Sequence, residues 1–433
     1  MVAEQSPVAT APSLWDRVRG PWEAPPFRWY WAGSLTQAIS FGMQFLVLGW
    51  LVLEVTGDKT RLGLTVSLYG FSNIGFLMVG GIIADRMDRK LLLMVTQTAV
   101  GAVIAVIAVL TVTESLALWH IYLSATLLGV LQALNMPARM AMIADLVGEQ
   151  RLLDAVAHFN AAQHVGRLVG PPVAGVMIDQ WGMGLVLALN AACFGASVLL
   201  LFMVHGTFSR PEVSRQPLLR HIGEGLSVIR TTPMLLTVLV MTCFFGGFGM
   251  AHLQVLPAFA KDMLDSSASE VGLLLLGSGI GALVGSLTLS LMHRAWLYRW
   301  LLFCLVTFTA LLTLLAWSGA LDDLTGSDWG GWFWITWVFV LLVGIVAIGW
   351  VWPLATTIMQ LSSPPEVRGR VMGVLHFVPG FHLVGAWPLT IAAAGIGWPL
   401  AITGAAGVCL LTTLSFGLVR KTGRQLATRP AVS

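Results

Sequence analysis

Apolar runs of about 20 residues recur along the whole chain and limit what it can fold into. The hydrocarbon core of a bilayer is about 30 Å thick, which a helix of roughly 20 apolar residues crosses. Twelve runs of this kind predict membrane-spanning helices at residues 29–53, 62–84, 91–112, 117–138, 155–178, 182–204, 233–257, 269–292, 298–319, 332–357, 371–393 and 396–419. Only 10% of the residues are charged, against about 25% in soluble domains. The chain is therefore predicted to be an all-α integral membrane protein.

The longest interval between runs divides these spans into two sets of six. Its part from 218 to 229 is predicted to form an amphipathic helix on the membrane surface. The expected parts are an N-terminal segment, a six-helix bundle, a central loop, a second six-helix bundle and a tail, at residues 1–28, 29–204, 205–232, 233–419 and 420–433. The first 26 residues have no apolar stretch long enough for a signal peptide, so insertion through the first span is expected.

Basic residues predict how the chain is oriented. Of the 24 Lys and Arg residues, 20 fall on one set of alternate loops, which includes both terminal segments and the central loop. The opposite loops hold Lys59, Arg61 and Lys261, and Arg167 lies inside a span. By the positive-inside rule, both termini and the central loop are predicted to be cytoplasmic.

Three short matches in chain order indicate that the two sets of spans are related. Residues 41–43 match 248–250, and 62–64 match 271–273. The third match pairs His158, Phe159 and His164 with His376, Phe377 and His382. Transporters built from parallel repeats place their substrate site between the halves near the middle of the membrane. The chain is therefore expected to form two pseudo-symmetric six-helix bundles and to move a small molecule across a membrane.

An ordered set of small, acidic and basic residues follows the second span. It comprises Gly81, Asp85, Arg86, Arg89 and Lys90. An acid at the membrane edge can bind a neighbouring helix N-terminus and an arginine, which predicts a latch between the halves in one state. A topology signal is the alternative interpretation. The string resembles motif A of the major facilitator superfamily, and helix count, central loop and duplication extend the resemblance over the whole chain. It implies that Asp85 and Arg86 form a gating network beside the basic Arg89 and Lys90.

A second string, rich in glycine and proline, lies inside the fifth span. It contains Gly166, Gly170, Pro171 and Gly175. Glycines four residues apart permit close helix packing, and proline kinks or stiffens a helix, so a packing kink is one interpretation. The string also resembles motif C, which is associated with exporters of the superfamily, although Ala174 replaces one glycine. Export is therefore predicted, with import on the same fold as the alternative.

Further strings narrow the resemblance to one bacterial branch. They are residues 135–139 after the fourth span, 145–147, 151–153, and 368–373 before the eleventh. This branch contains enterobactin-type siderophore exporters and macrolide-efflux-like proteins. The resemblance implies a monomeric, proton-coupled antiporter in the bacterial inner membrane that exports a small amphipathic molecule by alternating access. It identifies no particular substrate.

Charged and titratable groups inside or beside the spans are candidates for function because burying them in lipid costs free energy. Arg167 is open to two interpretations, a structural group bound to carbonyls freed by the prolines, or a contact for an anionic substrate or a gate. The candidates for proton coupling are Glu54, Asp85, His164, His252, His376 and His382. Each histidine is also interpretable as a polar residue lining a cavity. No Asp or Glu lies deep in a predicted span, so no buried carboxylate relay is expected.

Residues on the inner faces of the first, fourth, seventh and tenth spans are candidates for the substrate pathway. They are Gln37, Met43, Gln44, Phe245, His252, Gln254, Trp350 and Met359, together with His164 and Arg167. Aromatic, Met and amide side chains suit a bulky amphipathic ligand. Core packing of Met and an interfacial position of Trp are the alternatives.

Several functional classes are disfavoured. The chain has no phosphate-binding Walker A string, no nucleophile–base set and no metal-ligand spacing, so an enzyme, a cofactor and a metal are not expected. Its net charge of +3 is scattered, which argues against a nucleic-acid partner. The expected partners are lipid, a small-molecule substrate and protons. A membrane scaffold or receptor without a transport cycle is the remaining alternative.

Overall fold

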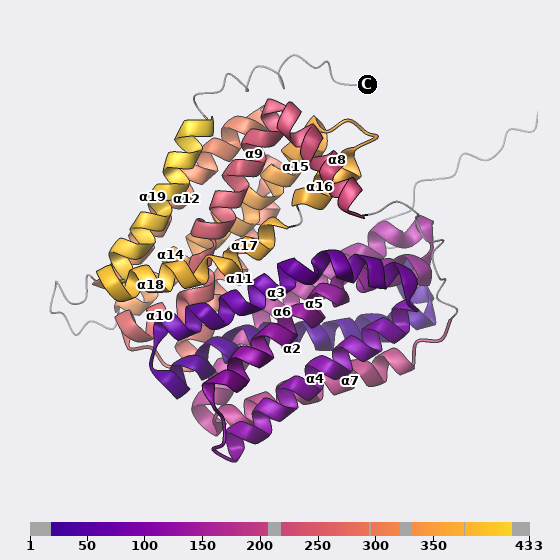
Figure 1. Ribbon diagram of the computed structural model, residues 1–433, viewed down its shortest axis with the longest axis horizontal. Helices are drawn as coiled ribbons and strands as arrows, with labels where there is room; N and C mark the ends of the chain where they lie inside the picture. The colour runs from indigo at the N-terminus through magenta and orange to yellow at the C-terminus, as the bar shows by residue number, and fades with distance from the viewer. Residues whose placement is uncertain (1–18, 207–217, 294–295, 321–330, 376, 418–433) are drawn as a thin grey trace, which may run out of the picture.

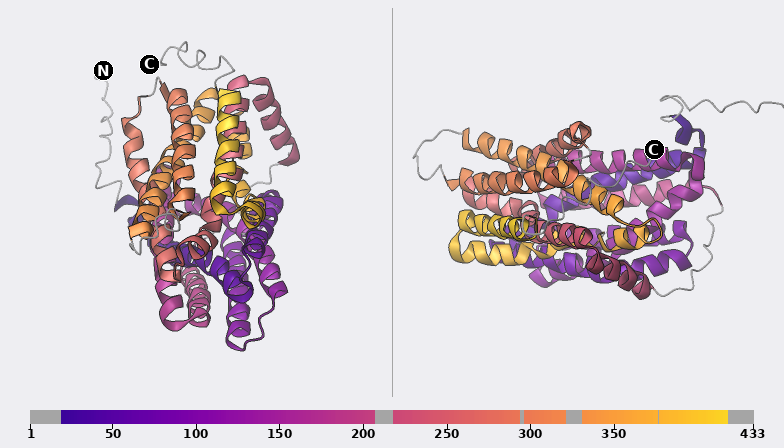
Figure 2. Two further views of the ribbon diagram at one scale, coloured as in Figure 1. Left: turned by 90° about the vertical axis from the view of Figure 1, so that its left-hand side faces the viewer. Right: turned by 90° about the horizontal axis from the view of Figure 1, so that it is seen from above.

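Two bundles of helices lie against each other at one end and diverge toward the other (Figure 1; Figure 2). The computed structural model describes residues 19–206, 218–293, 296–320, 331–375 and 377–417. The regular secondary structure of these residues is helical, with no strand among them. The predicted all-α class with two bundles is therefore confirmed.

The N-terminal bundle consists of long, continuous helices. A short 3-10 turn, η1 (Gly20–Glu23), precedes them, and η2 (Glu149–Arg151) joins the fourth to the fifth. The six helices are α2 (Pro25–Thr56), α3 (Lys59–Arg86), α4 (Arg89–Val112), α5 (Leu118–Val147), α6 (Leu152–Trp181) and α7 (Met183–Phe202). Their ends follow local sequence: α2 stops at Gly57, whose φ of 60° favours glycine. Asp58 and Asp88 cap the next two helices by accepting backbone N–H groups.

In the described part of the C-terminal bundle, six helical segments run along the bundle, and three of them are interrupted. Its elements are α9 (Pro233–Phe244), η3 (Phe245–Gly249), α10 (Ala251–Leu264), α11 (Ala268–Thr288), η4 (Leu289–Leu291), α12 (Leu297–Ser318), α14 (Gly331–Gly344), η6 (Ile345–Val351), α15 (Trp352–Ser362), α16 (Arg368–Leu375), α17 (Val378–Val384), α18 (Ala386–Ile396) and α19 (Trp398–Gly417). Here η3 and η6 are π-helical turns inside the seventh and tenth crossings, and the eleventh is divided into α16, α17 and α18.

A helix of the central loop accompanies the C-terminal bundle. The predicted amphipathic helix is present as α8 (Leu218–Thr231). It packs on α16 and α9, and the Glu224 carboxylate lies 2.7 Å from the Arg370 guanidinium. A Cβ on Gly225 would lie 2.6 Å from the carbonyl oxygen of Arg370. This helix is therefore held against the second half of the molecule.

The number of spans is only partly supported. Ten helical stretches among the described residues are long and apolar enough to cross a membrane, judged by length and composition. Helices α3 and α6, with 28 and 30 residues, pack among them but fall outside that set. The count of twelve spans thus remains a prediction.

One boundary prediction was wrong. Residues 135–139 were expected to follow the fourth span, but α5 continues to Val147 with Pro137 inside it. Proline is tolerated within membrane helices where neighbouring groups satisfy the freed carbonyl. Arg139, which had been counted with the loop residues, is consequently inside the bundle and only 1% exposed.

Two apolar cores hold these elements. The larger core contains residues of both bundles, including Met43, Phe259, Phe308 and Met359. A smaller core surrounds Phe159 among α2, α4, α5 and α6. It lies within the N-terminal bundle alone. This bundle therefore has an apolar core of its own at the end where the two halves diverge.

Candidate functional site

The bundles are joined at one end, here called the closed end, which holds the turns at residues 57–58, 113–117, 182, 265–267 and 397. Helix α6 packs on α11, and α3 packs on α17 and α18. A Cβ on Gly175 would lie 2.3 Å from the Ala268 carbonyl oxygen, and one on Gly63 would lie 1.9 Å from the Thr390 hydroxyl. Side chains at these glycines would force the halves apart, so the closed end depends on small residues.

Polar contacts reinforce the closed end. The Lys59 ammonium lies 2.8 Å from the Asp262 carboxylate, which also accepts the indole N–H of Trp398 at 2.8 Å. The Asp179 carboxylate accepts the backbone N–H groups of Ala268 at 3.2 Å and Ser269 at 2.8 Å. Lys59 and Asp179 belong to the first half and their partners to the second. Asp179 also meets the positive N-terminus of α11, where a negative charge is favourable.

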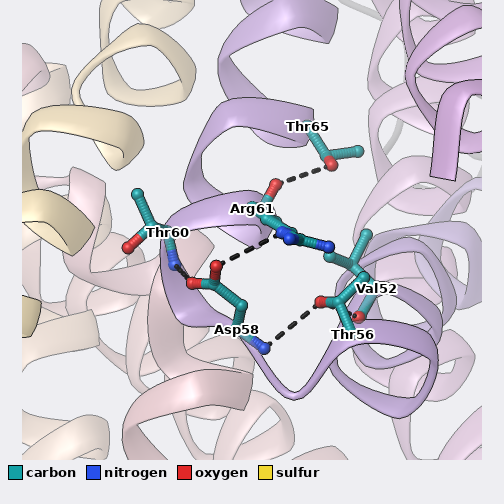
Figure 3. Close-up of polar contacts among 6 residues, drawn as sticks. All are labelled: Val52, Thr56, Asp58, Thr60, Arg61 and Thr65. Atoms are coloured by element: carbon teal, nitrogen blue, oxygen red, sulfur yellow. Dashed lines mark hydrogen bonds and ion pairs between the residues drawn. The ribbon is translucent and has the colours of Figure 1, made fainter.

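Local hydrogen bonds order the turn between α2 and α3, where Lys59 is the first residue of α3; Figure 3 shows these bonds. Asp58 accepts the backbone N–H of Thr60 at 2.7 Å and pairs with the Arg61 guanidinium at 3.3 Å. The backbone N–H of Asp58 donates to the Thr56 hydroxyl at 3.2 Å. These local bonds fix the first turn of α3, so that its lysine projects toward the other half.

Polar contacts at the opposite end stay within one half. Arg89 donates to the Asp145 carboxylate at 2.6 Å and to the Ala141 carbonyl at 3.2 Å, which ties α4 to α5. Lys90 donates to the Val204 carbonyl at 2.8 Å. Several hydrogen bonds and ion pairs join described residues of the first half to described residues of the second. All of them lie in the part of the molecule from the closed end as far as Ser67 on α3.

The first three residues of the predicted latch lie near the end of α3. Gly81, Asp85 and Arg86 occupy the last two turns of α3, and their side chains lie outside the described atoms. Of the five motif residues, Arg89 and Lys90 are seen to brace the N-terminal bundle internally. The gating role of Asp85 and Arg86 stays a prediction.

A cavity of about 530 Å³ lies between the two halves. Its wall is mainly apolar, with aromatic residues such as Phe41, Phe45 and Trp352. Its polar residues are Gln44, Tyr69, Asn73, Gln132, His164, Arg167, Gln254, Ser278 and His382. This combination of an apolar wall and a few polar groups is typical of a small-molecule site.

The structure brings part of the predicted pathway together at this cavity. Of the residues proposed from sequence, Gln44, His164, Arg167, Phe245 and Gln254 line it. His382, proposed only for proton coupling, lines it as well. His164 and His382 occupy matching positions in the two repeats, so each half contributes one imidazole.

Five other proposed residues lie outside the lining. Gln37 and Met43 are 3% and 1% exposed, and Met359 is 0% exposed. His252 is buried beside Phe308, and a ring nitrogen lies 2.6 Å from the Gly249 carbonyl oxygen. The indole of Trp350 donates to the Thr288 hydroxyl at 3.0 Å. These side chains pack against neighbouring helices because they sit on the faces turned away from the cavity.

Two further coupling candidates have no described place in the cavity. Glu54 lies on α2 one turn from the closed end and is exposed. His376 lies outside the described residues. Their role in coupling stays a prediction.

The glycine–proline string of α6 makes close helix crossings near the cavity. A Cβ on Gly166 would lie 2.3 Å from the Ala38 carbonyl oxygen, and one on Gly170 would lie 2.6 Å from the Met43 nitrogen. On another face of the same helix, a Cβ on Gly272 would meet the Pro171 carbonyl oxygen at 2.8 Å. The string therefore binds α6 to α2 in its own half and to α11 in the other.

Sequence reasoning missed two sets of residues. Tyr69 and Asn73 are four residues apart on α3 and share the face that lines the cavity. Polar residues at this spacing in an apolar span are a signal that could have identified them. Arg139 had no such signal, because residues 135–139 were expected to follow the fourth span. Its guanidinium donates to Asn135 and to Ser34, the latter at 3.0 Å.

Known proteins share this architecture and sequence pattern. The chain is 26% identical over 379 residues to "Multidrug efflux pump Tap" of Mycolicibacterium fortuitum, covering 85% of this chain and 87% of that protein. It is 25% identical over 356 residues to "Enterobactin exporter EntS" of Shigella flexneri, covering 81% and 80%.

Solved structures extend the comparison to the fold. The nucleoside transporter NupG matches with a TM-score of 0.72 at 16% identity, covering 92% of this chain and 100% of that one. A bacterial homolog of the human lysosomal transporter Spinster, in an inward-facing and occupied conformation, matches with a TM-score of 0.73 at 12% identity, covering 95% and 99%. The model of the Major Facilitator Superfamily matches residues 30–381. The chain belongs to the Major Facilitator Superfamily.

Proposed function

We propose that this protein is a secondary active transporter that exports a small amphipathic molecule by alternating access, driven by proton antiport. The observation that carries the proposal is the cavity of about 530 Å³ between two related bundles, with both halves supplying its wall. A site of this kind becomes accessible to either side when the bundles rock about it. No covalent chemistry is required, so the protein is proposed to act without a cofactor and not as an enzyme.

Export is favoured over import by two observations. The glycine–proline string of α6 resembles the exporter motif, and its glycines form close contacts beside the cavity. The relatives Tap and EntS are named as an efflux pump and an exporter. Import on the same fold is the alternative that a direction assay must exclude.

The basic residues support an orientation with the closed end outside the cell and both termini in the cytoplasm. The contacts of Lys59 with Asp262, and of Asp179 with α11, would then hold the outside shut in this state. We propose that Asp85 and Arg86 form the opposing latch when the cytoplasmic side closes. Each set of contacts is made in one state and broken in the other, as a two-state cycle requires.

The test is transport into everted bacterial inner-membrane vesicles across a panel of amphipathic compounds. The expected result is proton-gradient-dependent accumulation of at least one compound, abolished by an uncoupler. An Asp85→Asn variant should insert normally but transport strongly less, since its amide keeps the shape and loses charge-assisted bonds. Uptake that is unaffected by the uncoupler would remove proton coupling, and accumulation in right-side-out vesicles alone would indicate import.

A further inference from the structure

The charges around the cavity are unbalanced. Among the described residues that line it, Arg167 carries the one permanent charge, and none is Asp or Glu. The remaining titratable side chains are the imidazoles of His164 and His382 and the phenol of Tyr69. The lining therefore offers a positive charge and no negative one.

Arg167 is held in place but is not neutralised. Its neighbour Gly166 and the following Gly170 pack directly against the backbone of α2, which fixes this stretch of α6. The side chain is exposed in the cavity and makes no hydrogen bond or ion pair with any described residue. A guanidinium stays protonated under all ordinary conditions and presents five donors in a planar fork. Its donors are therefore available to a molecule that enters the cavity.

A lone cation within a membrane protein is costly unless it meets a counter-charge, water or carbonyl groups. A bound anion supplies that counter-charge, and its attraction to the guanidinium is stronger in a mainly apolar cavity than in water. A bound organic cation would face the same charge with no carboxylate to offset it. The charge of the lining therefore favours amphipathic organic anions over amphipathic organic cations of the same size and apolarity.

We propose that the cavity selects amphipathic organic anions, with the Arg167 guanidinium pairing with a carboxylate, sulfonate or phenolate group. His164 lies one turn before Arg167 on the same helix, and His382 occupies the matching position of the second repeat. The amides of Gln44 and Gln254 supply neutral hydrogen-bonding groups, and the aromatic wall holds the apolar part. This inference rests on the proposed transport function and names the substrate class for that site.

Binding of two probes with one ring system tests the charge preference. The purified full-length transporter would be titrated in detergent with 8-anilinonaphthalene-1-sulfonate, an anion, and with N-phenyl-1-naphthylamine, its neutral counterpart. Binding is read from energy transfer to the naphthalene ring, because Trp352 lines the cavity. Protein-free micelles correct for partitioning. The wild-type protein should bind the sulfonate about tenfold more tightly, the ratio expected for one charge-assisted pair.

Variants then locate the source of that preference. Arg167→Gln should weaken sulfonate binding about tenfold and change binding of the neutral probe less than twofold. Arg167→Lys should lie between, because it keeps the charge and loses the planar fork. Arg61→Gln is the matched control, since Arg61 is exposed outside the cavity and pairs with Asp58 in its own half. It should leave both affinities unchanged.

The outcomes separate this inference from the transport function. Equal or tighter wild-type binding of the neutral probe, or of the cation tetraphenylphosphonium, would overturn the anion preference even if no variant folds. An anion preference that persists in a folded Arg167→Gln protein would remove Arg167 as its cause. Gradient-driven export of neutral or cationic compounds without any anion preference would leave the proposed function standing and end this inference.

Discussion

The two halves of the molecule share a plan but differ in how their helices are built. The six helices α2 to α7 of the N-terminal bundle are uninterrupted and 20 to 32 residues long. In the C-terminal bundle, η3 and η6 insert wide turns into two crossings, and the eleventh consists of three short helices. π-helical turns often occur at functional sites, and here residues of both turns line the cavity.

This difference indicates that the two halves contribute different features to the cavity. The N-terminal bundle supplies the fixed charge, since Arg167 sits on a helix locked to its neighbour by glycine contacts. It also has its own core around Phe159 and a buried guanidinium at Arg139. The C-terminal bundle supplies interrupted helices, whose backbone bonds are easier to rearrange. We infer that conformational change during transport is concentrated in the second half.

The largest expected effect compares one glycine crossing in each half. A Cβ on Gly166 would lie 2.3 Å from the Ala38 carbonyl oxygen, whereas one on Gly385 would lie 1.7 Å from the Gly247 carbonyl oxygen in η3. If the second half adjusts more easily, Gly166→Ala should cost about 3 kcal/mol and Gly385→Ala less, despite its shorter contact. Detergent melting curves measure both, with Gly195→Ala and Gly404→Ala as open-space controls. A greater loss of stability for Gly385→Ala than for Gly166→Ala would contradict the inference that the second half adjusts more easily.

The buried guanidinium of the first half gives the next effect. Arg139→Lys should lower the free energy of unfolding by about 2 kcal/mol, because Lys cannot bond Asn135 and Ser34 together and leaves buried acceptors unsatisfied. The matched control is Arg151→Lys, whose side chain is 44% exposed and pairs with Glu23. Equal melting temperatures for the two variants would show that the Arg139 network adds no rigidity to its bundle.

The smallest effect concerns the contacts that join the halves. Lys59→Gln and Asp179→Asn should each destabilise the closed end by about 0.5–1 kcal/mol, because the first pair is partly exposed and the second is a helix-terminus contact. The open population should rise up to about fivefold. Spin-label distances between Ser115 and Leu400 would report this opening, with Arg151→Gln as the within-half control, because Arg151 pairs with Glu23 at the opposite end. Unchanged distances in both variants would mean that glycine packing alone closes this end.

Local signals identified most of the helices, although several helix ends lie beyond the predicted spans. Apolar length identified the membrane-spanning runs, and the amphipathic pattern identified α8. The ordered motif residues identified the superfamily that the family model also matches. An error arose at residues 135–139, which were expected to follow the fourth span but lie inside α5. Neither π-helical turn had been expected, because no simple residue pattern marks such a turn.

The cavity could be predicted only in part. Sequence proposed Gln44, which lines the cavity, but it also proposed the neighbouring Met43, which is buried in the core. The two residues differ by one helical position, about 100° around the axis. In a soluble protein the polar face of a helix would decide between them. Here lipid-facing and core-facing sides are equally apolar, so periodicity carries little information.

The sequence by itself determined the membrane-spanning class, the two-bundle plan and the superfamily, because apolar length, duplication and motif order are properties of the chain. Only the tertiary structure decided which polar groups meet. Lys59 and Asp262, which are 203 residues apart, form an ion pair, and Arg167 and His382, from different halves, line one cavity. These arrangements depend on how the two bundles pack through glycine contacts. The free energy of that packing comes from shape complementarity, which a local sequence pattern does not predict.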